Sequence, residues 1–192
     1  MAGRAPASRL QRADASARYA IVAARFNERI SERLVEGARH AFAAAKIPED
    51  RVDLYWVPGS FELPQAAYHL AVTGRYAGIV CVGVVIRGQT PHYEHVAREA
   101  AAGIRHVALA TGVPTGFGVI TTLDEAQAWA RAGGDVGNRG TEAADAALEM
   151  ARFVETVGRR ARPTANRRGG STAGSLPDRR GRGALRSGPG GK

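Results

Sequence analysis

The 192-residue sequence has little cysteine, no long apolar run and no leader-like start. Its single cysteine, Cys81, cannot form an internal disulfide and is expected to be a small buried residue of a cytoplasmic protein. No apolar stretch reaches the roughly 18 residues that a membrane-spanning helix needs. The first six residues also lack the apolar centre of a secretory signal.

Motifs for metals and nucleotides are missing as well. The five histidines are scattered along the chain, so no cluster has the spacing of metal ligands. Neither a G-x-G-x-x-G segment nor a P-loop is present, which gives no reason to expect a dinucleotide or ATP. We therefore expect no metal site and no nucleotide cofactor.

The excess of positive charge is confined to one end of the chain. The net charge is +9, and residues 159–192 carry nine arginines and Lys192 against the single acid Asp178. Residues 1–158 hold equal numbers of basic and acidic side chains. Because residues 161–192 are rich in Gly, Arg, Ser and Pro, they are expected to form a disordered tail. The tail is either a dispensable extension or binds RNA or another polyanion, and nucleic acid is expected as a partner only there.

Strand-like and helix-like patterns alternate along the rest of the chain. Residues 1–17 show no period and are expected to form a flexible arm, and residues 18–160 one folded domain. Apolar β-branched runs predict four strands, and spacings of three and four predict helices between them. The strands are Tyr19–Ala24, Val52–Val57, Ile79–Ile86 and Phe117–Thr122, with helices at about 30–45, 62–71, 91–109, 125–131 and 141–160. This alternation predicts an α/β three-layer sandwich, with helices on both faces of a four-stranded parallel sheet.

The most informative stretch joins the third strand to the helix after it. Ile79–Ile86 is apolar throughout, as in a strand buried on both faces. A polar turn follows, and then Thr90 and Pro91 are expected as the N-cap and first residue of a helix. The free N–H groups of such a junction favour a phosphate or another anion, and His92 would lie beside it. Most strand–turn–helix junctions bind nothing, so a purely structural junction is the alternative.

Other candidate ligand-binding residues follow the ends of the first two strands. Ligands of open parallel sheets bind beyond the carboxyl ends of the strands. Phe26 follows the first strand, and Ser60 and Glu62 follow the second. With the turn and His92 they would form a crevice for a flat polar ring with a polyhydroxyl chain, next to a phosphorylated partner. Phe26 could equally be a packing residue, and Glu62 could only favour a helix N-terminus.

Several separate motifs, in order, resemble those of one enzyme family. They are ARFN at 24–27, PGSFE at 58–62, G-x-V-I-R-G-x-T-x-H at 83–92 and GFGVITT at 116–122. Together they resemble lumazine synthase over about residues 19–160. The resemblance implies a flavodoxin-like fold and a cofactor-free enzyme of riboflavin biosynthesis. It would condense 5-amino-6-(D-ribitylamino)uracil with 3,4-dihydroxy-2-butanone 4-phosphate to 6,7-dimethyl-8-ribityllumazine, phosphate and water.

The resemblance also implies roles for individual residues. His92 matches the catalytic histidine, which acts as acid and base. The residues that would hold the butanone phosphate are Gly88, Gln89, Thr90 and Arg131. Those that would bind the pyrimidine are Phe26, Ser60, Phe61, Glu62, Val84, Val85, Ile86 and Phe117. In the family, Phe117 and Arg131 enter the site from a neighbouring subunit. Without the family, Arg131 would be interpreted as a solvated charge at the end of a short helix.

The family further implies a homo-pentamer with active sites between adjacent subunits, and a 60-subunit shell in some members. Three departures from the family pattern bear on assembly: Arg139 in place of the usual Lys, an arm without a β-rich pattern, and the basic tail. We expect the pentamer and leave the shell open. The alternative to an enzyme is a non-catalytic lumazine- or flavin-binding protein of the same fold, which the presence of His92 and Arg131 argues against.

Overall fold

The computed structural model describes residues 16–161, so the predicted arm and tail lie outside it except for Ser16, Ala17 and Ala161. Its main sheet is parallel, with the strand order β2-β1-β3-β4. The four strands are β1 (Tyr19–Ala24), β2 (Val52–Val57), β3 (Gly78–Ile86) and β4 (Thr115–Thr122). All four were predicted, and only the starts of β3 and β4 lie slightly earlier than expected.

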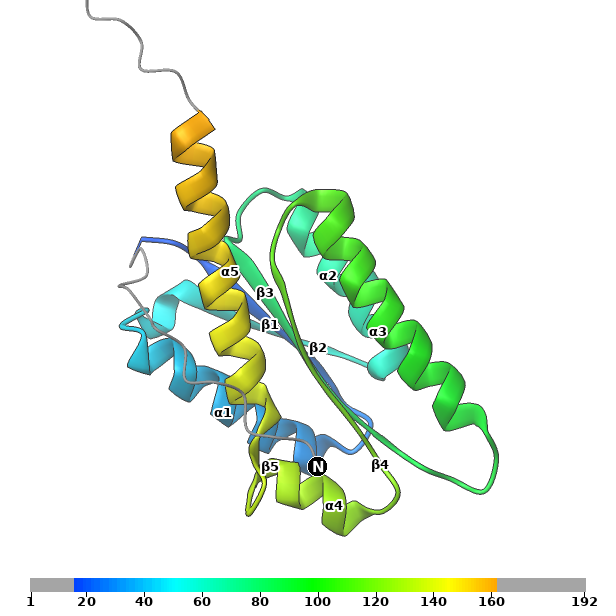
Figure 1. Cartoon of the computed structure of the whole chain (residues 1–192). Coiled ribbons are helices and arrows are strands. Elements are labelled where there is room, and N and C mark those ends of the chain that lie inside the picture. The colour runs from blue at the N-terminus through cyan, green and yellow to red at the C-terminus, as the bar shows by residue number, and fades with distance from the viewer. Residues whose placement is uncertain (1–15, 162–192) are drawn as a thin grey trace, which may run out of the picture. The chain divides into compact units, whose positions relative to one another are not determined.

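Helices cover both faces of this sheet (Figure 1). One face carries α1 (Glu28–Ala44), α4 (Glu125–Arg131) and α5 (Arg139–Ala161), and the other carries α2 (Leu63–Val72) and α3 (His92–Thr111). The predicted three-layer α/β sandwich is confirmed, and its strand order follows the flavodoxin-like pattern. None of the helices within residues 16–161 is long and apolar enough to cross a membrane.

The two central strands are buried because each supplies side chains to both apolar layers. In β3, Val80 and Val82 pack with α1 and α5, while Ile79 and Cys81 pack with α2 and α3. This explains why the segment is apolar without alternation. Strand β2 lies at the edge of the sheet and is only half buried.

The beginning of α3 differs from the prediction. The helix starts at His92, Pro91 occupies the N-cap position, and no side chain caps the helix. The Pro91 carbonyl already accepts a bond from the Glu94 amide (2.9 Å), so Thr90 lies one residue too far from the first turn to cap it. The prediction of Thr90 as the N-cap was therefore wrong. In contrast, α4 has its predicted bounds, and its capping residue is Asp124, which accepts a bond from the Gln127 amide (2.8 Å).

A small hairpin, β5 (Ala132–Gly134) and β6 (Gly137–Asn138), occupies the segment that the sequence predicted only as a glycine-rich connection. Gly133 and Gly137 have positive φ angles (113° and 93°), which glycine adopts at little cost. The side chain of Asn138 ends the hairpin by two kinds of contact. Its Oδ1 accepts bonds from the amides of Gly140 (2.8 Å) and Thr141 (3.2 Å), and its Nδ2 donates to the Arg33 carbonyl in α1 (2.8 Å). Helix α5 therefore begins two residues before its predicted start.

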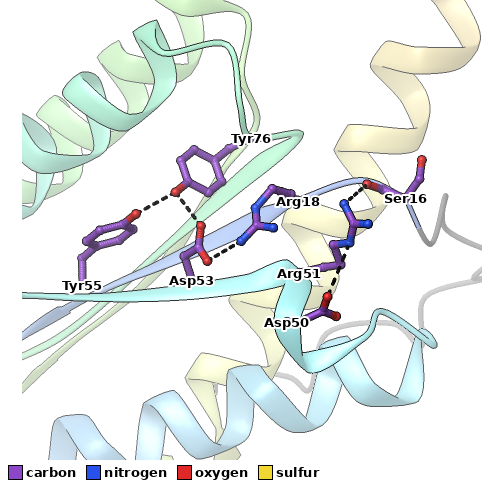
Figure 2. A network of polar contacts seen from close by, with 7 residues as sticks. All are labelled: Ser16, Arg18, Asp50, Arg51, Asp53, Tyr55 and Tyr76. Atoms are coloured by element: carbon purple, nitrogen blue, oxygen red, sulfur yellow. Dashed lines mark hydrogen bonds and ion pairs between the residues drawn. The ribbon is translucent and has the colours of Figure 1, made fainter.

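A polar network ties together the amino ends of the strands (Figure 2). The Asp53 carboxylate of β2 accepts bonds from the Arg18 guanidinium (2.6 Å) and the Tyr76 hydroxyl (2.7 Å), which in turn lies 2.8 Å from the Tyr55 hydroxyl. The bond from Tyr76, followed by that from Arg18, lowers the pKa of Asp53. Burial raises the pKa of Tyr76, so its hydroxyl stays protonated and can donate. The network lies at the end of the sheet opposite to the predicted ligand crevice.

Candidate functional site

A cavity of about 380 Å³ lies where the carboxyl ends of β1, β2 and β3 meet. Its walls come from five segments: the second residue after β1, the short 3₁₀ helix η2 (Ser60–Glu62) with the glycine before it, the end of β3, the turn after β3, and the start of α3. The lining residues are Phe26, Gly59, Ser60, Phe61, Glu62, Val84, Val85, Ile86, Gly88, Thr90, His92, Tyr93 and Val96. The structure thus brings together residues that lie far apart in the sequence, as the strand-end argument predicted.

Backbone hydrogen bonds fix the aromatic rim of the cavity. The amides of Arg25 and Phe26 donate to the carbonyls of Val57 (2.9 Å) and Pro58 (3.1 Å), so the end of β1 is held beside the end of β2. Phe26 is 71% exposed and Phe61 is 58% exposed. Two large aromatic rings at the mouth of a cavity leave apolar surface in water that a flat ligand or a partner would cover.

The end of β3 presents open backbone to the cavity. Strand β1 pairs with β3 only as far as Val82, whereas β4 continues to pair with it up to Ile86. On the β1 side, the stretch from Gly83 to Ile86 therefore has no neighbouring strand. Asn27, whose backbone is left-handed (φ 61°), donates from its side-chain Nδ2 to the Val84 carbonyl (3.3 Å). An unpaired strand end of this kind is where a ligand with hydrogen-bonding edges can contact backbone groups.

The polar turn and the start of α3 form another part of the wall. Gly88, Thr90 and His92 line the cavity, and His92 is the first residue of the helix. The first backbone N–H groups of a helix have no partner within it, and the positive end of its dipole lies there. Because no side chain caps α3, this wall suits an anion. The Arg87 guanidinium lies over the Tyr93 ring (6.0 Å to the centroid), which keeps a positive charge near the turn.

Three residues that the resemblance assigned to the site do not line the cavity. Gln89 belongs to the same turn but is not among the lining residues. Phe117 lies in the edge strand β4, where it pairs with Cys81 of β3, and it is 47% exposed. Arg131 ends α4, which packs on the face opposite to α3, and it donates to the Gln127 carbonyl (3.0 Å). All the other predicted site residues line the cavity of the single chain.

Sequence reasoning missed Gly59, Tyr93 and Val96. A signal for the two α3 residues existed in the sequence. Val96 follows His92 by four residues, so both side chains lie on one face of the helix, and Tyr93 adjoins His92 in its first turn. Within residues 16–161, no group of three or more His, Cys, Asp or Glu side chains is placed to hold a metal ion.

A second hollow of about 400 Å³ lies between α1, α4 and the hairpin. Arg33, Trp129 and Asp135 are among its lining residues, and it contains none of the predicted site residues. Its wall also offers fewer reactive side chains, because all of its other lining residues are glycine or alanine. We therefore take the cavity beside α3 as the candidate site.

The fold and the cavity define a doubly wound α/β protein that binds a small molecule beyond the carboxyl ends of its strands. The cavity combines aromatic rings, a carboxylate, hydroxyls, the uncapped start of a helix and an imidazole. Comparison with protein families is consistent with this. The family model of 6,7-dimethyl-8-ribityllumazine synthase matches residues 16–155. The chain belongs to this family of transferases, which acts in riboflavin biosynthesis, and the resemblance noted in the sequence is confirmed.

Proposed function

We propose that this chain condenses 5-amino-6-(D-ribitylamino)uracil with 3,4-dihydroxy-2-butanone 4-phosphate, with His92 as the acid and base. The product is 6,7-dimethyl-8-ribityllumazine, and phosphate and water are released. The observation that supports the proposal is the cavity itself, which in a chain of this family is lined by His92 together with Phe26 and the segment Ser60–Glu62.

The cavity suits the pyrimidine at its aromatic side. Phe26 and Phe61 offer rings for stacking, Ser60 and Glu62 offer hydrogen bonds to the ribityl chain, and the open edge of β3 around Val84, Val85 and Ile86 faces the uracil. Phe117, entering from a neighbouring subunit as proposed below, completes the contact with the pyrimidine ring.

The turn suits the phosphate of the second substrate. Gly88, Gln89 and Thr90 precede the uncapped start of α3, where backbone N–H groups favour an anion. Arg131 supplies a guanidinium that can bind phosphate through two parallel hydrogen bonds. Its positive charge stabilises the phosphate as it leaves.

The chemistry needs proton transfers that imidazole can perform near neutral pH. Forming an imine from an amine and a ketone, eliminating phosphate and closing the ring each move protons. A positioned acid–base group contributes roughly 10²–10⁴-fold to the rate. Holding both substrates in one cavity contributes much of the remainder.

The decisive experiment follows lumazine formation by absorbance and fluorescence. Purified chain is mixed with both substrates, and the rate is compared with the uncatalysed background and with the His92→Ala variant. We expect the variant to lower kcat by about 10²–10⁴-fold with little change in substrate binding. Tight binding of lumazine or riboflavin without any acceleration would instead favour the alternative, a non-catalytic binder of the same fold.

We further propose a homo-pentamer in which Phe117 and Arg131 enter the cavity of a neighbouring subunit. This is supported by their position outside the cavity of their own chain. Arg131→Ala should chiefly raise the KM for the phosphorylated substrate. Mixed assemblies of His92→Ala and Arg131→Ala subunits should recover about a quarter of the activity, because random neighbours leave that fraction of shared sites intact. A site built within one chain would recover none.

Several assignments remain predictions: a cytoplasmic location, a 60-subunit shell as an alternative assembly, and polyanion binding by residues 161–192. For the tail, binding to RNA that disappears on truncation after Arg160 and weakens steeply with salt would support that added role.

A further inference from the structure

One buried hydroxyl beside the cavity has no hydrogen-bond partner. Ser60, the first residue of η2, is only 4% exposed, and its Oγ bonds to no atom of the part of the chain that the structure describes. Ser60 also lines the cavity. A buried hydroxyl without a partner is destabilising, so its presence here requires an explanation.

The space that holds this hydroxyl exists because β3 has a glycine opposite it. A Cβ added at Gly83 would lie 2.5 Å from Oγ of Ser60, and 3.2 Å and 3.3 Å from side-chain carbons of Ala24 and Leu63. Real Cβ atoms do not approach another heavy atom as closely as 2.5 Å, whereas the other two contacts need only small adjustments. Gly83 lies in an ordinary strand conformation, so this contact, rather than backbone strain, decides what a side chain would do there.

We propose that Gly83 is a positioning residue for substrate binding: its missing side chain leaves the space in which the Ser60 hydroxyl is held at the floor of the cavity. A methyl group at position 83 displaces Ser60 toward the cavity and narrows the place where the pyrimidine binds. The inference rests on the proposed function, since it takes the ribityl-bearing pyrimidine as the ligand. It adds a residue that touches no substrate and acts through Ser60.

The test measures binding of the fluorescent product, 6,7-dimethyl-8-ribityllumazine, to four forms of the full chain: wild type, Ser60→Ala, Gly83→Ala and the double variant. We expect Ser60→Ala to weaken binding about threefold through loss of one hydrogen bond, and Gly83→Ala to weaken it about tenfold through displacement. In the double variant the 2.5 Å contact is gone. Its lumazine affinity should therefore return to that of Ser60→Ala. Adding Ser60→Ala to Gly83→Ala should thus strengthen lumazine binding.

Urea unfolding of the same four proteins separates this role from general destabilisation. Ser60→Ala should be neutral or stabilising, because it removes a buried hydroxyl without a partner. Gly118→Ala is the matched control: its Cβ would lie 2.9 Å from Val82, 3.1 Å from the Cys81 carbonyl oxygen and 3.2 Å from Ala143, on the face away from the cavity. It should destabilise the protein as Gly83→Ala does, with unchanged lumazine affinity.

The outcomes are distinguishable. A wild-type chain that binds no lumazine would overturn the proposed function and this inference with it. If the wild type binds lumazine, the inference alone fails where Gly83→Ala binds as tightly as the wild type, where the double variant binds no more tightly than Gly83→Ala, or where Gly118→Ala shows the same loss of affinity.

Discussion

Replacing Asn138 tests how α5 is joined to α1. Its Oδ1 accepts bonds from the amides of Gly140 and Thr141, and its Nδ2 donates to the Arg33 carbonyl. The first two bonds cap the helix, and losing such a cap costs about 1 kcal/mol. The third bond joins two helices and is worth about 1 kcal/mol more. We therefore expect Asn138→Ala to lower the free energy of unfolding by about 2 kcal/mol.

Two comparisons divide this loss between the cap and the bond to α1. Asn138→Asp keeps the acceptor oxygen at the start of α5, where a carboxylate is favoured, but it cannot donate to Arg33. It should cost about 1 kcal/mol. Asp124→Ala removes a cap of α4 that makes no such bond to another helix, and it should also cost about 1 kcal/mol.

Urea unfolding followed by circular dichroism measures these differences at one fixed protein concentration, because assembly contributes to stability. With a slope of roughly 2 kcal/mol per molar urea, Asn138→Ala should lower the midpoint by about 1 M. Equal losses for Asn138→Ala and Asp124→Ala would refute the reasoning, since they would leave no energy for the bond to Arg33. Wild-type stability of Asn138→Asp would refute it as well.

The remaining predictions concern titratable groups. Because the pKa of Asp53 is lowered in the folded chain, its contribution to stability is present above the unfolded value of about 4 and is lost as the pH falls through the folded value. Asp53→Asn should therefore be less stable at pH 7, with an unfolding free energy that changes less between pH 5 and pH 2 than in the wild type; parallel curves would contradict this. Burial raises the pKa of Cys81 to about 12, so a thiol reagent at pH 8 should label the folded chain slowly and the urea-unfolded chain completely. Equal labelling rates would show that the strand opens.

The architecture could be predicted because its signals are local. The apolar runs at β1 and β3 and the periodic helix α1 each follow from a few neighbouring residues, and their order predicts a parallel sheet. The sequence did not distinguish the half-buried edge strand β2 from the central strands, because strand order depends on pairing between distant segments. The start of α3 was mispredicted for a local reason, because both Thr90 and Pro91 favour helix starts. The Pro91 carbonyl, rather than the threonine side chain, accepts the first hydrogen bond of the helix.

The candidate site divides into two groups according to sheet geometry. The residues that follow β1, β2 and β3 converge because the carboxyl ends of parallel strands meet at one edge, as the sequence predicted for Phe26, Ser60 and His92. Gly59 and Val96 were missed because they carry no reactive group and enter the wall only through the shape of the loop and helix around them.

The second group cannot reach the cavity of its own chain. Phe117 pairs with Cys81, five residues before the end of β3 at Ile86, which corresponds to about 16 Å along the strand. Arg131 lies in a helix that packs on the face of the sheet opposite to α3. Strand β4 is also an edge strand, and a half-exposed aromatic ring on an edge favours contact with another chain. This geometry supports the proposal that a neighbouring subunit completes the site. It also explains why motifs alone, which carry no distances, combined the two groups into one site.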